Sequence, residues 1–191
     1  MVTPGFKKSY SEQTQSLDVH IPGTFNTRAM PVTNATNVVD MNPGALMVSG
    51  RALDVYVNTS GAIAVQGPEG QELYTRRGDL TISADGQLMT GTGSLVLGDG
   101  GPITVPGGSN ISITNDGSVN MIPRGANAEV TVGRIKLVDT KDTEMLIRED
   151  GLYQVREGAL PASADITLTT RALEGSNVTV VDSMVRMITL S

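Results

Sequence analysis

Three Asp-Gly pairs, each between two short runs rich in apolar residues, constrain the fold of this chain more than any other feature. The pairs are Asp85-Gly86, Asp116-Gly117 and Asp150-Gly151. Two-residue Asp-Gly loops suit the positive backbone φ angles of a type I′ turn, which joins neighbouring antiparallel strands. The sequence therefore predicts three β-hairpins, each with an Asp-Gly pair in its turn.

Short alternating segments continue through residues 44–172 at the turn spacing of antiparallel β domains. The longest candidate strand covers residues 128–138, where Gly133 interrupts the alternation and predicts a β-bulge or a close backbone contact. Gly98-Asp-Gly-Gly101 predicts a tight strand-to-strand crossover, because it lacks the Gly-Lys-Ser/Thr of a phosphate-binding loop. We predict a mainly β fold, a single antiparallel domain of about ten short strands.

The composition agrees with this fold class. The 191 residues include 22 Gly and 9 Pro but no Trp, 2 Phe and 4 Tyr, and small and branched aliphatic side chains favour strands. We divide the chain into an extended N-terminal arm (1–43), a β-rich domain (44–172) and a C-terminal helix that begins at 173. Within the arm, Leu17-Asp-Val-His-Ile21 alternates and is a candidate strand for a sheet edge.

Residues 177–190 have the pattern of a short two-faced helix. Seven apolar side chains fall on one half of the helical wheel: Val178, Val180, Val181, Met184, Val185, Met187 and Ile188. Such a helix is marginal alone in water, and its apolar half needs a partner. Since the pattern runs almost to the last residue, we expect a truncated assembly helix.

Catalytic and metal chemistry finds little support. The chain has one histidine, His20, no cysteine and no Gly-x-Ser-x-Gly motif, which argues against a hydrolytic triad and a zinc site. Turn chemistry explains the Asp-Gly pairs better than calcium binding does. Arg77-Gly78-Asp79 matches an integrin-type tripeptide but leads into a predicted strand. We expect no enzyme activity and no cofactor.

Charge and hydropathy exclude two further classes of partner. The net charge is −6 and the 14 basic residues are scattered, so the sequence has no cluster of positive charge that would bind the phosphates of a nucleic acid. No apolar run approaches 18 residues, and no signal peptide is evident at the start of the sequence. We expect neither nucleic-acid binding nor membrane insertion.

A β-rich carbohydrate-binding or adhesin-type module is the alternative that these residues leave open. Such a module would use aromatic platforms, and the four tyrosines that could supply them are Tyr10, Tyr56, Tyr74 and Tyr153. An enzyme that works with carboxylates alone is a third and weaker possibility, given 20 acidic residues.

Several segments resemble flagellar rod and hook proteins. Thr3-Pro-Gly-Phe-Lys7 resembles the turn that follows the N-terminal helix in that family, and Leu173-Glu-Gly-Ser-Asn-Val178 with Met184-Val-Arg-Met-Ile188 resembles the start of its C-terminal helix. Tyr74-Thr-Arg-Arg-Gly-Asp-Leu80 and Gly98-Asp-Gly-Gly-Pro-Ile-Thr-Val-Pro106 are similar to the body of the group. The latter stretch, with residues 132–138, is most similar to proximal rod members.

The resemblance implies a structural, non-enzymatic subunit of the bacterial flagellar basal-body rod, a drive-shaft component. It implies axial assembly through paired terminal helices with other rod subunits, while the β domain forms the outer layer. Export through the flagellar type III apparatus without a cleavable signal, a location in the periplasmic span, and a truncated chain that is monomeric by itself are further expectations. The expected assembly residues are Phe6, Leu173, Val178, Val181, Met184, Val185 and Ile188. Packing of the C-terminal helix on its own β domain is the alternative.

Overall fold

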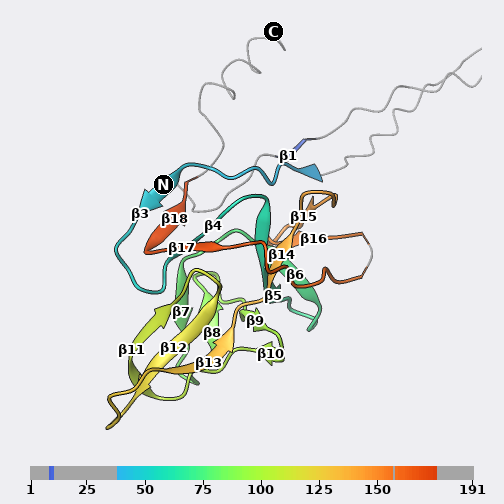
Figure 1. Cartoon of the computed structure of the whole chain (residues 1–191). Helices are drawn as coiled ribbons and strands as arrows, with labels where there is room; N and C mark the ends of the chain where they lie inside the picture. The colour runs from blue at the N-terminus through green and yellow to red at the C-terminus, as the bar shows by residue number, and fades with distance from the viewer. Residues whose placement is uncertain (1–8, 11–37, 157, 176–191) are drawn as a thin grey trace, which may run out of the picture.

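The computed structural model describes residues 9–10, 38–156 and 158–175. These residues form eighteen strands and no helix, and every strand pair is antiparallel (Figure 1). The predicted mainly β, antiparallel fold is confirmed. The strands outnumber the predicted ten because many are only two or three residues long. The candidate strand at 17–21 and the helical pattern at 177–190 lie outside the described residues.

The largest sheet has seven strands in the order β1-β2-β15-β16-β6-β5-β14. Their bounds are Ser9–Tyr10 (β1), Val38–Val39 (β2), Leu146–Ile147 (β15), Tyr153–Gln154 (β16), Glu72–Thr75 (β6), Gly61–Gln66 (β5) and Leu137–Asp139 (β14). Strands β1 and β2 both come from the predicted N-terminal arm. Because they form one edge of this sheet, these two parts of the arm belong to the domain.

The remaining strands form smaller sheets. A three-stranded sheet contains Gly108–Ile113 (β11), Ser118–Pro123 (β12) and Val130–Arg134 (β13). Four strand pairs join Leu80–Ile82 (β7) to Leu88–Thr90 (β8), Leu97–Gly98 (β9) to Gly101–Pro102 (β10), Val55–Val57 (β4) to Leu168–Thr170 (β17), and Leu46–Val48 (β3) to Ala172–Glu174 (β18). In Figure 1, β7, β8 and β11–β13 lie at one end of the molecule, and β1, β3 and β18 at the other.

The three Asp-Gly hairpins are present, but their turns are not of type I′. In the β7–β8 hairpin, Ser83 N donates to Gln87 O (2.9 Å) and Gly86 N donates to Ser83 O (3.0 Å), which closes a three-residue loop. Gly86 has φ 79°, whereas Asp85 is not among the residues with positive φ. A type I turn followed by glycine in the left-handed region matches the strand twist equally well. The turns at Gly117 and Gly151 repeat this hydrogen-bond pattern.

The predicted strand 128–138 is two strands in different sheets, β13 and β14. The expected bulge is present, since Val119 pairs with Gly133 and Asn120 pairs with Thr131, which leaves one extra residue between them. A Cβ at Gly133 would lie 3.2 Å from Ile103, so the backbone also approaches a neighbour closely. The single-strand prediction was wrong because the chain crosses from one sheet to the other after Arg134.

Two apolar clusters form the core, one on each face of the seven-stranded sheet at β5. Along β5, Ile63 and Val65 belong to the larger cluster, whereas Ala62 and Ala64 belong to the smaller one. This two-sided burial explains why β5 is apolar at nearly every position. Met41, from the predicted arm, is buried in the smaller cluster. No helix among the described residues is long and apolar enough to span a membrane.

Candidate assembly site

Of the seven predicted assembly residues, the described part of the chain contains one, Leu173. It lies half-buried in β18, where it pairs with Met47 of β3. The predicted helix was therefore wrong at Leu173 and Glu174, because pairing with β3 holds them in an extended conformation. The other six residues, Phe6, Val178, Val181, Met184, Val185 and Ile188, lie outside the described residues.

Strands β3 and β18 form a two-stranded ribbon, called here the exit ribbon, at the point where the chain continues toward its C-terminal segment (Figure 1). Gly175 N donates to Ala45 O (2.7 Å) and Ser49 N donates to Arg171 O (2.9 Å) at its two ends. In this register the peptide groups of Leu46 and Val48 point away from β18. Among the described strands, none pairs with that outer edge of β3.

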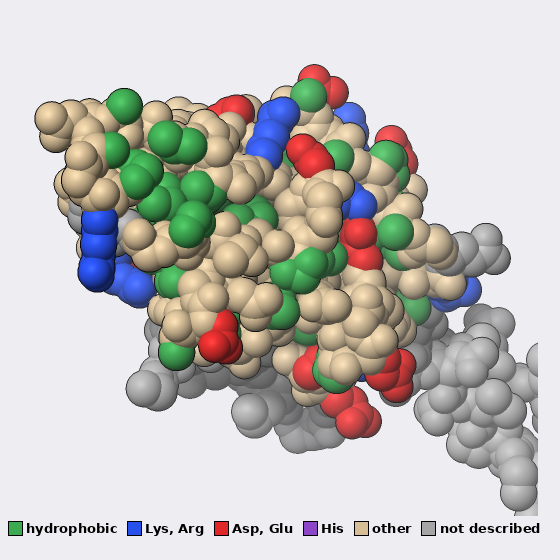
Figure 2. All heavy atoms as spheres, turned by 90° about the horizontal axis from the view of Figure 1, so that it is seen from below, with side chains coloured by type: hydrophobic (Ala, Val, Ile, Leu, Met, Phe, Trp, Pro, Cys, Tyr) green, Lys and Arg blue, Asp and Glu red, His purple; other side chains and the backbone are tan. Residues whose placement is uncertain are grey.

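The side chains of β3 are apolar and exposed. Leu46 is 47% exposed, Met47 51% and Val48 83%, and the remaining large apolar residue exposed in the described chain is Val130 in β13 (48%). The opposite end of the molecule carries several separate groups of hydrophobic side chains, the largest of which lies toward one side (Figure 2). An uncharged apolar edge strand is a favourable surface for protein contacts. The exit ribbon is therefore the candidate assembly surface within the described residues.

A buried ion pair holds β18 against the domain. Arg76 Nε, at the end of β6, lies 2.7 Å from Glu174 Oε2, and both side chains are 0% exposed. Arg76 also donates to the carbonyl oxygens of Val57 (2.8 Å), Thr59 (2.9 Å) and Gly61. A buried ion pair is tolerated only when such further hydrogen bonds satisfy its remaining groups.

The same carboxylate binds the segment that precedes β3. Glu174 Oε1 accepts a hydrogen bond from Gly44 N (2.6 Å), and the Tyr56 hydroxyl donates to Gly44 O (3.1 Å). A Cβ at Gly44 would collide with the carbonyl oxygen of Gly175, so the position requires glycine. We call Gly44, Tyr56, Arg76 and Glu174 the polar node; it joins the roots of both strands of the exit ribbon.

Sequence reasoning missed the polar node. In the sequence Arg76 is only one residue of the segment 74–80 that resembles the rod and hook family, and Glu174 falls in the predicted helix. The usable indication was an arginine directly after a short strand that contains Leu73 and Tyr74, because a charge that becomes buried at such a position needs a buried partner. Local patterns do not say which of the 20 acidic residues that partner is.

Three of the four tyrosines are buried and cannot form the aromatic platform of a glycan-binding site. Tyr56, Tyr74 and Tyr153 are 8%, 0% and 2% exposed. Burial raises the pKa of Tyr74 to about 12, and it also raises the pKa of Tyr56 and of Tyr153. The Tyr74 hydroxyl donates to Glu72 Oε1 (2.9 Å) and accepts from Leu160 N (2.6 Å). The glycan-binding alternative therefore lacks its predicted site at these three positions.

The arginine and the aspartate of the integrin-type tripeptide bind each other. Arg77 Nε lies 2.8 Å from Asp79 Oδ1, and a second bond of 2.9 Å joins Arg77 to Asp79 Oδ2. Because each side chain already binds the other, neither is presented to a receptor. Asp79 also faces Asp54 across a β-bridge, and the nearly buried Asp54 carboxylate forms an ion pair with Arg51 at 3.1 Å.

A pocket of about 210 Å³, lined in part by Asp99, Asp116, Arg134 and Ser163, shows no catalytic arrangement. Hydrogen bonds from Thr114 and Ser118 lower the pKa of Asp116 to about 2, which makes it a poor proton donor or acceptor near neutral pH. No group of three or more acidic or histidine side chains among the described residues is placed to hold a metal ion.

The β domain matches a known family. Residues 56–121 match the family described as the flagellar hook protein FlgE/F/G D1 domain. This match covers most of β4 to most of β12, and the class of protein that it indicates is that of flagellar rod and hook components.

Sequence identity to named relatives narrows the class of protein further. The chain is 37% identical to the flagellar basal-body rod protein FlgF of Salmonella typhimurium and 36% identical to that of Escherichia coli K12, each over 97% of this chain and 76% of the relative. It is 30% identical to FlgG of Buchnera aphidicola from Acyrthosiphon pisum, over 76% of this chain and 58% of the relative. The chain belongs to the FlgF family of flagellar basal-body rod proteins.

Proposed function

We propose that this chain is a structural, non-enzymatic subunit of the bacterial flagellar rod, of the proximal type, and that it assembles axially through its terminal segments. The observation that carries the proposal is the 37% identity to a FlgF protein over 97% of the chain. The names of the relatives describe rod proteins, which supports a structural role.

In this proposal the apolar half-face of residues 178–188 packs against a partner helix, and the β domain forms the outer layer of the rod. Leu173 is the one assembly residue whose position is described, and it lies in the exit ribbon immediately before that segment. The exposed apolar side chains of β3 lie beside it. A surface of this kind at the root of the segment supports assembly through this end of the domain.

The partners in this proposal are further copies of the chain and neighbouring rod subunits, in the part of the basal body that crosses the periplasm. The chain reaches this location through the flagellar type III export apparatus. The absence of cysteine from the sequence is compatible with a chain that is exported unfolded, because no disulfide must be reduced first.

The test is complementation of swimming in a strain that lacks its own proximal rod protein, with the complete gene product. We expect Val181→Asp with Val185→Asp to abolish swimming and rod assembly, because both charges fall on the apolar half of the helical wheel. The matched control is Thr179→Asp with Ser183→Asp on the polar half, which should swim normally. Normal swimming of the valine variant would contradict the proposal.

A further inference from the structure

The exit ribbon by itself is poorly suited to withstand load. Its two strands pair at three positions, from Ala172↔Val48 to Glu174↔Leu46. All three side chains of β3 are exposed, so little apolar packing supports the strand to which β18 is bonded. Strands with few buried contacts open at a low free-energy cost. A pull on the segment after Gly175 would therefore peel the ribbon unless another contact carried the force.

We propose that the Arg76–Glu174 pair is a mechanical anchor, which passes load from the C-terminal segment directly into the core of the β domain. The proposal rests on the rod function, because only an assembled subunit transmits torque and axial force. It concerns residues that belong to no predicted assembly contact and to no catalytic arrangement.

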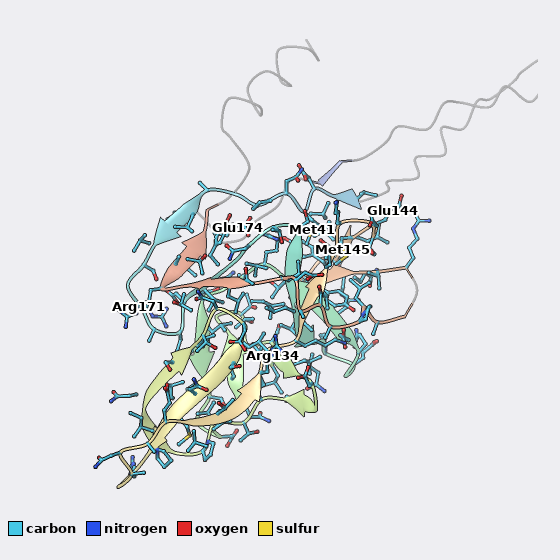
Figure 3. The ribbon with its side chains drawn as sticks, viewed as in Figure 1. Met41, Arg134, Glu144, Met145, Arg171 and Glu174 are labelled. Atoms are coloured by element: carbon cyan, nitrogen blue, oxygen red, sulfur yellow. The ribbon has the colours of Figure 1, made fainter. Side chains whose placement is uncertain are left out.

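The geometry places the anchor at the right point of the chain. Glu174 is the last residue of β18 and lies one residue before Gly175, where the described part of the chain ends. In Figure 3, Arg171 and Glu174 lie at the two ends of this strand. Force applied from the C-terminal side therefore reaches Glu174 before it reaches the pairing of Ala172 and Leu173 with β3.

Arg76 spreads that force over a second segment. Its guanidinium binds Glu174 Oε2 and three carbonyl oxygens between residues 57 and 61, which connect β4 to β5. Strand β5 is buried on both faces at the centre of the domain. Hydrogen bonds of charged groups are about twice as strong as neutral ones. The path from Glu174 to the core thus consists of the strongest class of hydrogen bond.

Gly44 couples the other strand of the ribbon to the same anchor. Its N–H is bound by Glu174 Oε1 at 2.6 Å, and its carbonyl oxygen is bound by the Tyr56 hydroxyl at 3.1 Å. Movement of Glu174 would pull on the segment between β2 and β3. The anchor therefore keeps both strands of the exit ribbon in register under load.

An optical trap can test this directly, because the chain has no native cysteine. Handles are attached at Asp85→Cys, in the exposed β7–β8 turn, and at Ser191→Cys, the last residue. At constant force we expect the parent chain to release β18 only when the whole domain unfolds. With Glu174→Gln, β18 should detach before the rest of the domain, in a short extension step. The time for which β18 stays attached at a given force should fall at least about tenfold, which is the effect of losing one charge-assisted hydrogen bond.

The matched control is Glu72→Gln, which removes the Lys136–Glu72 ion pair of 2.8 Å from β6, outside the proposed path. The control should leave the detachment of β18 unchanged. Equal lifetimes for Glu174→Gln and the parent chain, or an equal shortening by both variants, would overturn the anchor. The trap acts on the isolated chain, so a failed anchor leaves the rod assignment standing, and failed complementation leaves the measured anchor standing.

Hydrogen exchange on the unaltered chain provides a second measurement if Glu174→Gln does not fold. The amide of Gly44 should exchange at least about tenfold more slowly than the outward-facing amides of Leu46 and Val48, because it is bonded inside the anchor. Similar exchange rates at Gly44 and Val48 would show that the anchor opens freely, and would overturn the proposal.

Discussion

Arg76 Nε and Glu174 Oε2 lie 2.7 Å apart, both fully buried, although 98 residues separate them in the chain. This contact closes the domain, since it joins the end of β6 to the last described strand. It is also the contact that we propose carries load from the C-terminal segment, and stability measurements can isolate its contribution.

We expect Glu174→Leu to lower the free energy of unfolding by about 3–5 kcal/mol, because it leaves the Arg76 guanidinium buried without its counter-charge. Urea denaturation monitored by circular dichroism measures this loss. The double variant Arg76→Met with Glu174→Leu should be more stable than Glu174→Leu alone, since no unpaired charge remains. A double variant less stable than the single one would contradict this account of the pair.

Arg51 should matter more than an ordinary surface arginine. Its partner, Asp54, has a side chain only 1% exposed, and apart from the 3.1 Å ion-pair contact with Arg51 the buried Asp54 Oδ1 atom has no hydrogen bond among the described residues. Arg51→Ala would leave this carboxylate without compensation, which costs about 1–3 kcal/mol in urea denaturation. The control is Arg156→Ala, whose pair with Glu144 is 60% and 65% exposed and should contribute about 0–1 kcal/mol. Equal losses would contradict the prediction.

Alkaline pH should destabilise the domain through Tyr74. Its pKa in the folded chain is about 12, above the ordinary value of 10.0, because burial disfavours the phenolate. The neutral hydroxyl therefore stabilises the fold fully below pH 10, and this contribution is lost as the pH rises toward 12. Urea denaturation from pH 8 to pH 11 should show the decline. Tyr74→Phe, which cannot ionise, should be less stable at pH 8 and decline less steeply; an equal slope would contradict the assignment.

Alanine substitutions at two glycines can distinguish the stability cost of backbone strain from that of a steric collision. Gly86 and Gly151 occupy the same position in equivalent turns, with φ 79° and 78°. A Cβ at Gly86 would lie 2.7 Å from Val105 O, whereas a Cβ at Gly151 would have no neighbour within 4 Å. We expect Gly151→Ala to cost about 1 kcal/mol from the positive φ alone. Gly86→Ala should cost roughly 2 kcal/mol more, because the Val105 N to Gly86 O hydrogen bond must also move. Thermal unfolding of both variants tests the difference.

The hairpins were accessible from the sequence because their causes are local. Asp-Gly pairs between apolar runs identified the turns at Gly86, Gly117 and Gly151, and the interruption at Gly133 identified the bulge in β13. The turn type was wrong because three-residue loops with glycine in third place satisfy the same residue preference as two-residue loops. The resemblance to rod proteins came from short motifs and agrees with the relatives.

The candidate site was less accessible. The resemblance predicts that Leu173 is an assembly residue, but the strand conformation of Leu173 depends on pairing with Met47, a residue far away in the chain. Arg76 and Glu174 lie in segments whose local patterns indicate a strand and a helix, and neither pattern specifies a partner. The polar node forms only in the folded chain, because its four residues come from four segments that are distant in the sequence.

The antiparallel β class, the places of the Asp-Gly turns and the rod and hook family follow from the order of residues alone, because turn preferences, strand alternation and family motifs depend on neighbouring residues. The division of residues 128–138 between two sheets, the extended conformation of Leu173 and Glu174 in the exit ribbon, and the ion pair of Arg76 with Glu174 appear only in the folded chain. These three features depend on contacts between segments that are distant in the sequence. Burial then selects one partner among many that the sequence allows equally.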